Sequence, residues 1–309
     1  MVASERVEVG INAVIVAVTA GVPRIITLTG TPDALPTGTL DPSLDRTLER
    51  ALRRWVREGT GIDLGYVEQL YTLGDLGRGL DPTVRLVSVA YLALVRESAP
   101  SSGSGAGWND LYEFFPWEDR RGGRPGVVED AVVPALEAWA DKGTDRAGRE
   151  ARRERSQIMF GLGVSAWDVE RVLERYELLW EIGFVPEAGA ERCDDAINGR
   201  PLALDHRRIA AQALGRIRGK ARYRPVVFEL LPETFSLTRL QRVVEALSGV
   251  TIHAQNFRRL LDRGGLVERT GLFDTSTGGR PAELHRFRRE VLRERPAPGV
   301  GLPGLRTSG

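Results

Sequence analysis

The first hundred residues alternate apolar runs and polar segments in a way that is typical of a sheet with one amphipathic helix. β-Branched residues fill two segments on either side of a Gly21-Val22-Pro23 turn, a pattern that predicts a β-hairpin. Apolar residues then recur at helical spacing, and two strand-like runs follow, the second almost continuously apolar and therefore expected inside the sheet. The expected elements are strands at 7–18 and 24–28, a helix that begins at Ser43 and is stopped by Gly59 and Gly61, and strands at 66–75 and 84–95.

Between residues 97 and 198 the apolar pattern becomes helical. A segment rich in Gly and Ser, 97–107, is expected to be a flexible connector, and the aromatic segment 108–125 fits no regular pattern. Three helices are predicted after it, at about 127–141, 144–161 and 166–183. This block is expected to serve packing or dimerisation rather than catalysis.

The last third of the chain has the order of elements of a winged helix-turn-helix domain. The expected elements are helices at 205–219, 237–247 (with Ser236 as its N-cap) and 251–264, followed by strands at 266–271 and 282–288 around a Gly-rich loop. In such domains the second helix of the helix-turn-helix pair enters the DNA major groove. The order therefore predicts DNA binding, with protein binding as the minority alternative.

Composition narrows the class of protein. The 309 residues carry a net charge of only +1, but residues 1–198 hold 22 Lys and Arg against 32 Asp and Glu, whereas residues 199–295 hold 20 against 10. A basic third favours a polyanionic partner, although the two parts could also neutralise each other across an interface. A single cysteine, Cys193, excludes a disulfide framework, and three dispersed histidines announce no metal site. No apolar run could span a bilayer and the charged N-terminus does not fit a signal peptide, so the cytoplasm is the expected compartment.

The side chains expected at DNA are those that read base edges or hold phosphates. In the major groove Asn and Gln pair with adenine and Arg with guanine, and such residues lie on the outer sides of the third predicted helix. Other arginines and a lysine follow the first of these helices or lie in the loop between the strands, where they suit phosphate or minor-groove contacts. The predicted DNA-binding residues are Gln255, Asn256, Arg258 and Arg259 in the major groove, and Lys220, Arg222, Arg224 and Arg280 on the backbone or minor groove.

The nonapeptide "RWVREGTGI", residues 54–62, resembles the end of the Nudix box, Gly-x5-Glu-x7-Arg-Glu-U-x-Glu-Glu-x-Gly-U, in which U is aliphatic. Arg54 and Glu58 match the box, but Trp55 and Gly59 stand where two glutamates belong. Those glutamates hold Mg²⁺ against a diphosphate so that a metal-bound water can attack it. The resemblance therefore implies an α/β Nudix fold without the hydrolase's carboxylates: no catalytic residues, no metal, no cofactor, and not an enzyme.

A degenerate Nudix domain joined to a winged helix resembles the Nudix-related transcriptional regulators of NAD metabolism, the NrtR-like family. The resemblance rests on stretches such as "VEQLYTLGD", "LALDHRRIAAQALGRIRGK", "NFRRLLDRGGLVERTG" and "GRPAELHRFR", and covers roughly residues 8–96 and 201–288. The long block between looks like the larger alphaproteobacterial NAD-regulator variant. The resemblance implies a homodimeric repressor of NAD biosynthesis or salvage genes that binds a palindromic operator, is released by ADP-ribose or NAD, and is associated with the nucleoid.

The expected domains are a Nudix-like effector-binding domain at 1–96, a helical insertion and linker at 97–198, a winged helix at 199–295 and a flexible tail at 296–309.

Arginine side chains, which bind phosphate oxygens in pairs, could replace Mg²⁺ at the effector's diphosphate. The residues expected at this effector site are Arg54, Glu58, Arg78 and Arg85. The alternative is an active Nudix hydrolase of ADP-ribose or a related nucleotide tethered to DNA, with Glu49 or a residue of another loop replacing a lost ligand. Apolar positions of the helical block are expected to form the dimer; the alternative is that they pack only on their own Nudix-like domain.

Overall fold

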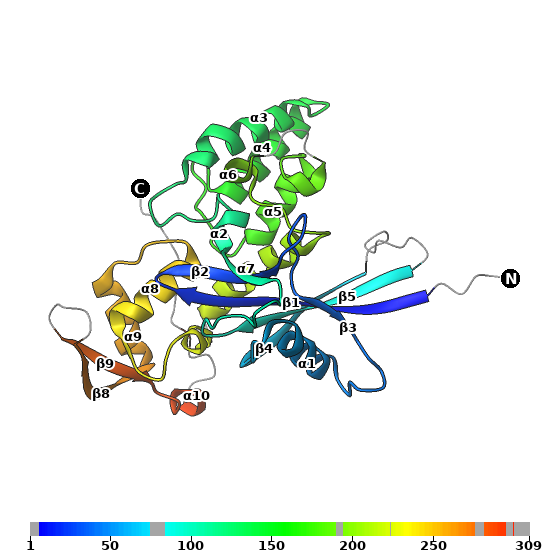
Figure 1. The fold of residues 1–309 in the computed structure, drawn as a ribbon. Helices are drawn as coiled ribbons and strands as arrows, with labels where there is room; N and C mark the ends of the chain where they lie inside the picture. Colours follow the sequence, from blue (N-terminus) through cyan, green and yellow to red (C-terminus); the bar gives the residue numbers. More distant parts are fainter. Residues whose placement is uncertain are drawn as a thin grey trace.

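A mixed six-stranded sheet lies at the centre of the molecule (Figure 1). The computed structural model describes residues 6–74, 84–189, 194–222, 224–275, 281–294 and Gly299. The sheet consists of β1 (Arg6–Thr19), β2 (Val22–Leu28), β3 (Thr37–Thr39), β4 (Tyr66–Leu73), β5 (Val84–Leu94) and β6 (Ala106–Asp110), in the order β4-β5-β1-β2-β6 with β3 beside β1. Strands β1 and β5 run parallel, and the other pairs are antiparallel. The predicted hairpin and the interior position of β5 are confirmed, but the turn lies at Ala20 and Gly21, and Val22 and Pro23, predicted in the turn, already pair with β1.

The two faces of the sheet are covered by different helices. Odd-numbered residues of β1, such as Ile11 and Ile15, pack against α1 (Leu48–Thr60), whereas even-numbered residues, such as Val14 and Val16, pack towards α7 and α8. The period of two along a strand produces this division. Helix α7 (His206–Ala221) and helix α8 (Leu237–Ser248) lie on the face opposite α1.

Helix α1 begins at Leu48, so the predicted start at Ser43 is wrong. The Asp41 carboxylate accepts a hydrogen bond from the backbone amide of Ser43 at 2.8 Å and closes a turn there. The helix starts only after Thr47, whose hydroxyl caps its first turn. It ends at Gly61, which has a φ of 73°, so of the two predicted stops only this one is correct and Gly59 lies inside the helix.

The segment 97–107 is part of the sheet domain, not a flexible connector. The Ser101 amide donates to the Thr60 carbonyl at the end of α1, and the Thr29 amide donates to the Gly105 carbonyl. Strand β6, at the end of this segment, pairs with β2. The expected boundary at residue 96 therefore cuts through the sheet, because these long-range backbone bonds continue it to Asp110.

The helical insertion lies on the side of the sheet away from α1 (Figure 1). It contains α2 (Leu111–Phe114), a π-helical turn (Val128–Val132) that continues into α3 (Val133–Asp141), α4 (Arg146–Phe160), α5 (Val172–Glu181), a 3-10 turn (Pro186–Ala188) and α6 (Asp195–Asn198). The three predicted helices are confirmed, although α5 begins six positions after the predicted Ala166, at Val172.

The C-terminal part forms a winged helix, but its first helix is not the predicted one. It contains a 3-10 turn (Val226–Leu230), β7 (Phe235–Ser236), α8, α9 (Ala254–Gly264), β8 (Val267–Asp274), β9 (Ala282–Phe287) and α10 (Val291–Glu294), with strand order β7-β9-β8. Helix α7, which the sequence pattern assigned to this domain, packs mainly against α5 and also touches the sheet. The 3-10 turn takes its place ahead of β7, so the expected boundary at residue 199 also moves.

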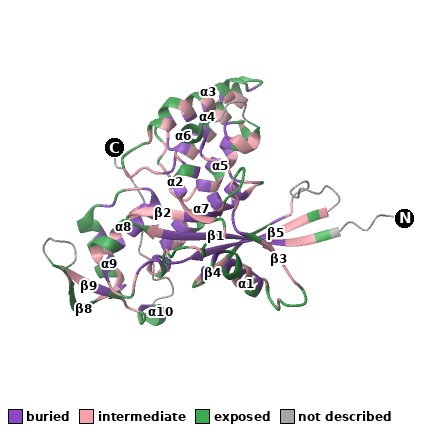
Figure 2. Ribbon diagram, in the orientation of Figure 1, coloured by how far each residue is buried: buried purple, intermediate pink, exposed green. Residues whose placement is uncertain are grey.

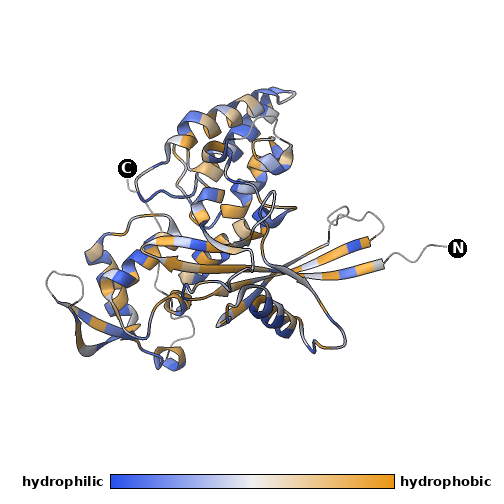
Figure 3. Cartoon of the chain, viewed as in Figure 1, coloured by the Kyte–Doolittle hydropathy of each residue, from blue (hydrophilic) through white to orange (hydrophobic). Residues whose placement is uncertain are grey.

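One apolar core joins the sheet, the insertion and the winged helix. Val16 of β1, Phe115 and Val172 of the insertion, and Leu240 and Phe257 of the winged helix belong to a single cluster of buried side chains. Buried residues are concentrated along β1 and the helices that cover it, whereas α9 and α10 are largely exposed (Figure 2). The outer side of α1 is hydrophilic (Figure 3). The winged helix is therefore packed onto the rest of the chain rather than linked to it by a tether.

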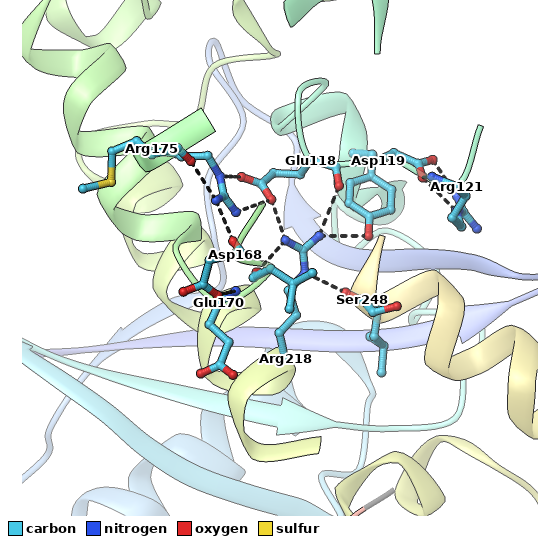
Figure 4. Close-up of polar contacts among 12 residues, drawn as sticks. Glu118, Asp119, Arg121, Asp168, Glu170, Arg175, Arg218 and Ser248 are labelled. Carbon is cyan, nitrogen blue, oxygen red and sulfur yellow. Dashed lines mark hydrogen bonds and ion pairs between the residues drawn. The ribbon is translucent and has the colours of Figure 1, made fainter. Parts of the chain in front are cut away.

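A buried ion cluster lies where these three parts meet (Figure 4). The Glu118 carboxylate, fully buried, accepts two hydrogen bonds from Arg175 of α5 (2.6 and 2.9 Å) and one from Arg218 of α7 (2.5 Å). Both guanidiniums are also fully buried. Burial by itself would raise the pKa of the Glu118 carboxyl, but the two guanidiniums hold it below its usual value. Burial also raises the pKa of Tyr112, beside Arg218, to about 12, so this phenol is neutral.

We expect Glu118 to give the protein a component of stability that depends on pH. Because its folded pKa is lowered from 4.5, its contribution is present above that pH and is lost as pH falls through the folded value. Glu118→Gln should lower the free energy of unfolding by about 3–5 kcal/mol near neutral pH, since it leaves two buried guanidiniums uncompensated. Urea unfolding at a series of pH values should show this difference shrinking below pH 4.5. A difference in unfolding free energy that stays constant down to acid pH would contradict this role of Glu118. The control is Glu150→Gln, whose carboxylate forms an exposed pair with Arg146 and whose removal should not change the free energy of unfolding.

Candidate functional site

The helix-turn-helix consists of α8, a short turn and α9. Ser236 caps α8 as predicted, accepting from the Arg239 amide, and Gly249 ends it with a φ of 69°. In the turn, the Glu245 carboxylate accepts from the Ile252 amide at 2.9 Å. Ile252 is therefore buried ahead of the helix, and α9 begins at Ala254 rather than at Thr251.

Helix α9 is strongly amphipathic. Phe257 and Leu261 are buried, as predicted, whereas Leu260 is half-buried. The four side chains expected in the major groove are all exposed: Gln255, Asn256, Arg258 and Arg259. Arg259 donates a hydrogen bond to the Asn256 side chain, which orients both groups on the helix surface. The structure thus brings together four groups able to pair with base edges.

The predicted basic cluster after α7 is not part of this face. Lys220 donates to Tyr66 at 2.7 Å and pairs with Glu68 at 2.5 Å, both on β4. Arg222 pairs with Glu170 at 2.6 Å. These contacts hold α7 to the sheet and to the loop before α5, which is a structural role rather than the expected DNA contact. Arg224 is exposed. Arg280 lies outside the described residues, as does Arg78 of the expected effector site.

Helix α1, which carries the Nudix-like motif, packs against β3 through an aromatic side chain. Trp55 packs on Gly38 of β3 so closely that a Cβ at position 38 would lie 2.6 Å from its ring. Trp55 stands where the resembling motif has its first glutamate after the arginine, and its indole packs against β3 instead of offering an oxygen ligand. Gly59, at the other altered motif position, is exposed, and a Cβ added to it would meet no atom within 4 Å.

Arg54 keeps its motif position but is tied within the domain. It makes two hydrogen bonds to the Asp45 carboxylate (3.1 and 2.8 Å) and one to Glu58 (3.2 Å). The Asp45 hydrogen bond raises the pKa of Arg54 above its usual value and lowers that of Asp45. The sequence pattern did not predict the Asp45–Arg54 pair, because it placed Asp45 on the helix instead of in the loop before α1. Arg85, at the other end of the expected site, donates to the Gly74 carbonyl.

Carboxylates in the described ranges do not gather as metal ligands would. No group of three or more His, Cys, Asp or Glu side chains suited to a metal occurs there. Glu49, the alternative ligand, pairs with Arg53 on the same helix at 2.9 Å. Trp and Gly side chains offer no oxygen to a hard cation. The residues present do not fit the Mg²⁺ cluster of a Nudix hydrolase.

Comparison with known proteins supports the assignment of the C-terminal part. The family model "NrtR DNA-binding winged helix domain" matches residues 227–287. Residues 227–287 form a winged helix domain of the NrtR type. The match begins at the 3-10 turn and ends at β9, which agrees with the exclusion of α7 from this domain.

A curated relative and two solved structures extend the likeness. The ADPR responsive transcriptional repressor NtrR of Acinetobacter baylyi is 38% identical over 86 residues, which are 28% of this chain and 34% of that protein, so the match spans about a third of the relative. Shewanella oneidensis NrtR complexed with a 27mer DNA has a TM-score of 0.57 at 23% identity, covering 92% of this chain and 95% of that chain. A MutT/nudix family protein from Enterococcus faecalis has a TM-score of 0.53 at 17% identity, covering 93% and 89%. These structures confirm the predicted fold class, a Nudix-like domain followed by an NrtR-type winged helix.

We expect Gly38 and Gly59 to respond oppositely to alanine. Gly38→Ala should destabilise the protein by about 1–3 kcal/mol, because its Cβ would overlap the Trp55 ring. Gly59→Ala, in open space within α1, should be neutral or stabilise by up to about 1 kcal/mol. Both are measured by chemical unfolding. Trp55→Ala should remove the penalty of Gly38→Ala in a double-mutant cycle, and additive effects would contradict the packing described.

Proposed function

We propose that the chain is a transcriptional repressor that binds operator DNA through α9 and senses a nucleotide through its Nudix-like domain. The match of residues 227–287 to the NrtR DNA-binding winged helix, with base-reading side chains exposed on α9, carries this proposal. The similar structure from Shewanella oneidensis is described as complexed with DNA. The genes controlled would be those of NAD biosynthesis or salvage.

The effector that we propose is ADP-ribose, with NAD as the second candidate. The curated relative is described as ADPR responsive, and its name supports this choice. Glu58, whose side chain is 64% exposed, and Arg85, also exposed, are the members of the expected effector site most open to a ligand; Arg54 would act mainly by orienting Glu58. Binding without hydrolysis follows from the loss of carboxylates at Trp55 and Gly59.

We further propose a homodimer on a palindromic operator, in the cytoplasm and associated with the nucleoid. Two-fold symmetry of the protein would mirror that of the DNA, with half-sites spaced by about one helical turn or a multiple of it. Exposed apolar side chains of the insertion, Ile158, Val164 and Trp180, support a role in association. None of the helices in the described part of the chain has the length and apolar character needed to span a bilayer.

The DNA-binding face is tested with Arg258→Ala. We expect a loss of about 1–3 kcal/mol of specific affinity, since an arginine pairing with a guanine edge would be removed. The measurement is fluorescence anisotropy on a palindromic duplex selected by the unmodified protein from a randomised pool. Arg146→Ala is the matched control, because this arginine is exposed on α4 and pairs only locally with Glu150.

Equal affinity of Arg258→Ala and the unmodified protein would remove α9 from the base-reading role. Sedimentation of the complex on the same duplex should give two protein chains per palindrome. A single chain per palindrome would exclude the dimer.

The effector domain is tested by calorimetry and by product analysis. ADP-ribose should bind equally well with and without Mg²⁺, and its addition should release the selected duplex. No AMP should form beyond a metal-only control, because the carboxylates that hold the metal are missing. Release of AMP that depends on Mg²⁺ and is abolished by Glu58→Gln would instead establish the hydrolase.

A further inference from the structure

The end of α8 and the turn after it form hydrogen bonds with residues outside the winged helix. Four of them are within 2.9 Å: Tyr112 hydroxyl to the Ala246 carbonyl, Arg218 Nε to the Leu247 carbonyl, Arg120 amide to the Gly249 carbonyl, and Thr251 hydroxyl to the Arg121 carbonyl. Three of the donors lie on α7 or on residues 112–121, the segment that opens the helical insertion. We call this segment together with Arg218 the clasp.

The clasp meets α8 at the place where a helix most needs partners. The last carbonyls of a helix have no partner within it, and a cation near them is favoured by the helix dipole. The clasp supplies both a neutral donor, Tyr112, and a charged one, Arg218. The clasp lies so close to Gly249 that no larger side chain fits there: a Cβ at this position would lie 2.4 Å from the Glu118 carbonyl oxygen and 2.7 Å from Arg218 Nη2.

Glu118 fixes the geometry of the clasp. Its carboxylate binds Arg218, which donates to α8, and Arg175, which in turn donates to the carbonyls of Met159 and Asp168 (Figure 4). The Glu118 carbonyl also accepts from Arg218. One buried residue thus connects the insertion, α7 and the C-terminus of α8.

We propose that the helical insertion positions the helix-turn-helix for DNA through the hydrogen bonds that join the clasp to the end of α8 and to the turn. This inference rests on the proposed function. Helix α9 follows directly from the turn that the clasp holds, so the clasp sets the angle of α9 relative to the sheet domain. A winged helix fixed in this way loses little orientational freedom when it meets its operator.

The test uses conservative changes that loosen the clasp while leaving the buried carboxylate in place. Tyr112→Phe/Thr251→Val removes two of the four bonds and preserves side-chain volume. Tyr66→Phe is the matched control, because it removes a phenol that bonds Glu68 and Lys220 on the other side of α7. A second control is the single variant Thr251→Ser, which keeps a hydroxyl at position 251 and leaves Tyr112 unmodified.

Affinity is measured for the duplex selected by the unmodified protein and for an unrelated duplex, at one salt concentration and at a temperature where every variant is folded. The double variant should lose about tenfold in the ratio of specific to non-specific affinity. Hydrogen exchange should become faster at the amides of the turn and the first part of α9. Tyr66→Phe and Thr251→Ser should leave both readouts unchanged.

An unchanged affinity ratio and unchanged exchange in the double variant would overturn the positioning role while leaving DNA binding intact. A loss of thermal stability with an unchanged ratio would also overturn it, since the clasp would then be only structural. If the unmodified protein selects no duplex from the pool, the proposed function fails, and this inference fails with it.

Discussion

The carboxylate of Glu118, buried between two arginines, is the constraint on which the relative placement of the three parts depends. Removing charged groups from water is unfavourable, and only good geometry offsets that loss. Here the carboxylate receives three hydrogen bonds, and the guanidiniums also donate to backbone carbonyls of the insertion and of α8. Since these partners come from distant segments, the charges are satisfied only when all of those segments are in place. Glu118 therefore couples local folding of the insertion to docking of the winged helix.

This coupling explains why the chain is not a string of separate domains. Helix α8 packs on β1 and β2 of the sheet, while α7 fills the space between the sheet and α5. The apolar core is correspondingly continuous from β1 to α9. In the proposed regulator, the Nudix-like domain and the helix-turn-helix are therefore joined by packed side chains rather than by a flexible hinge. A small displacement in a closely packed core is passed on because packed cores do not deform smoothly.

The sequence predicted the elements whose signals are local. The hairpin, the Ser236 cap, the end of α1 at Gly61 and the wing strands all follow from turn residues and periodicity. The errors arose where a distant partner decides the outcome. The connector at 97–107 is fixed by backbone bonds to residues more than forty positions away. A basic cluster at Lys220 gives the same sequence pattern whether it faces DNA or, as here, a carboxylate on β4. Arg54 was expected to bind the effector, and no sequence pattern could show that it is already paired with Asp45.

The Nudix-like helix shows what remains of a motif when its chemistry is not used. Arg54, Gly61 and the aliphatic positions Val56 and Ile62 still serve the fold: the first through Asp45, the second by ending the helix, and the last two in the core. At the two positions where the resembling motif has glutamates, this chain has Trp55, which packs against Gly38, and Gly59, which has no side chain. The indole of Trp55 fills the space between α1 and Gly38 of β3. In the proposed function, a nucleotide binds at the surface of this domain. Under the proposed function, binding and release of this nucleotide, rather than its hydrolysis, are the events that reach the helix-turn-helix, because Trp and Gly side chains offer no ligand for a metal-bound water.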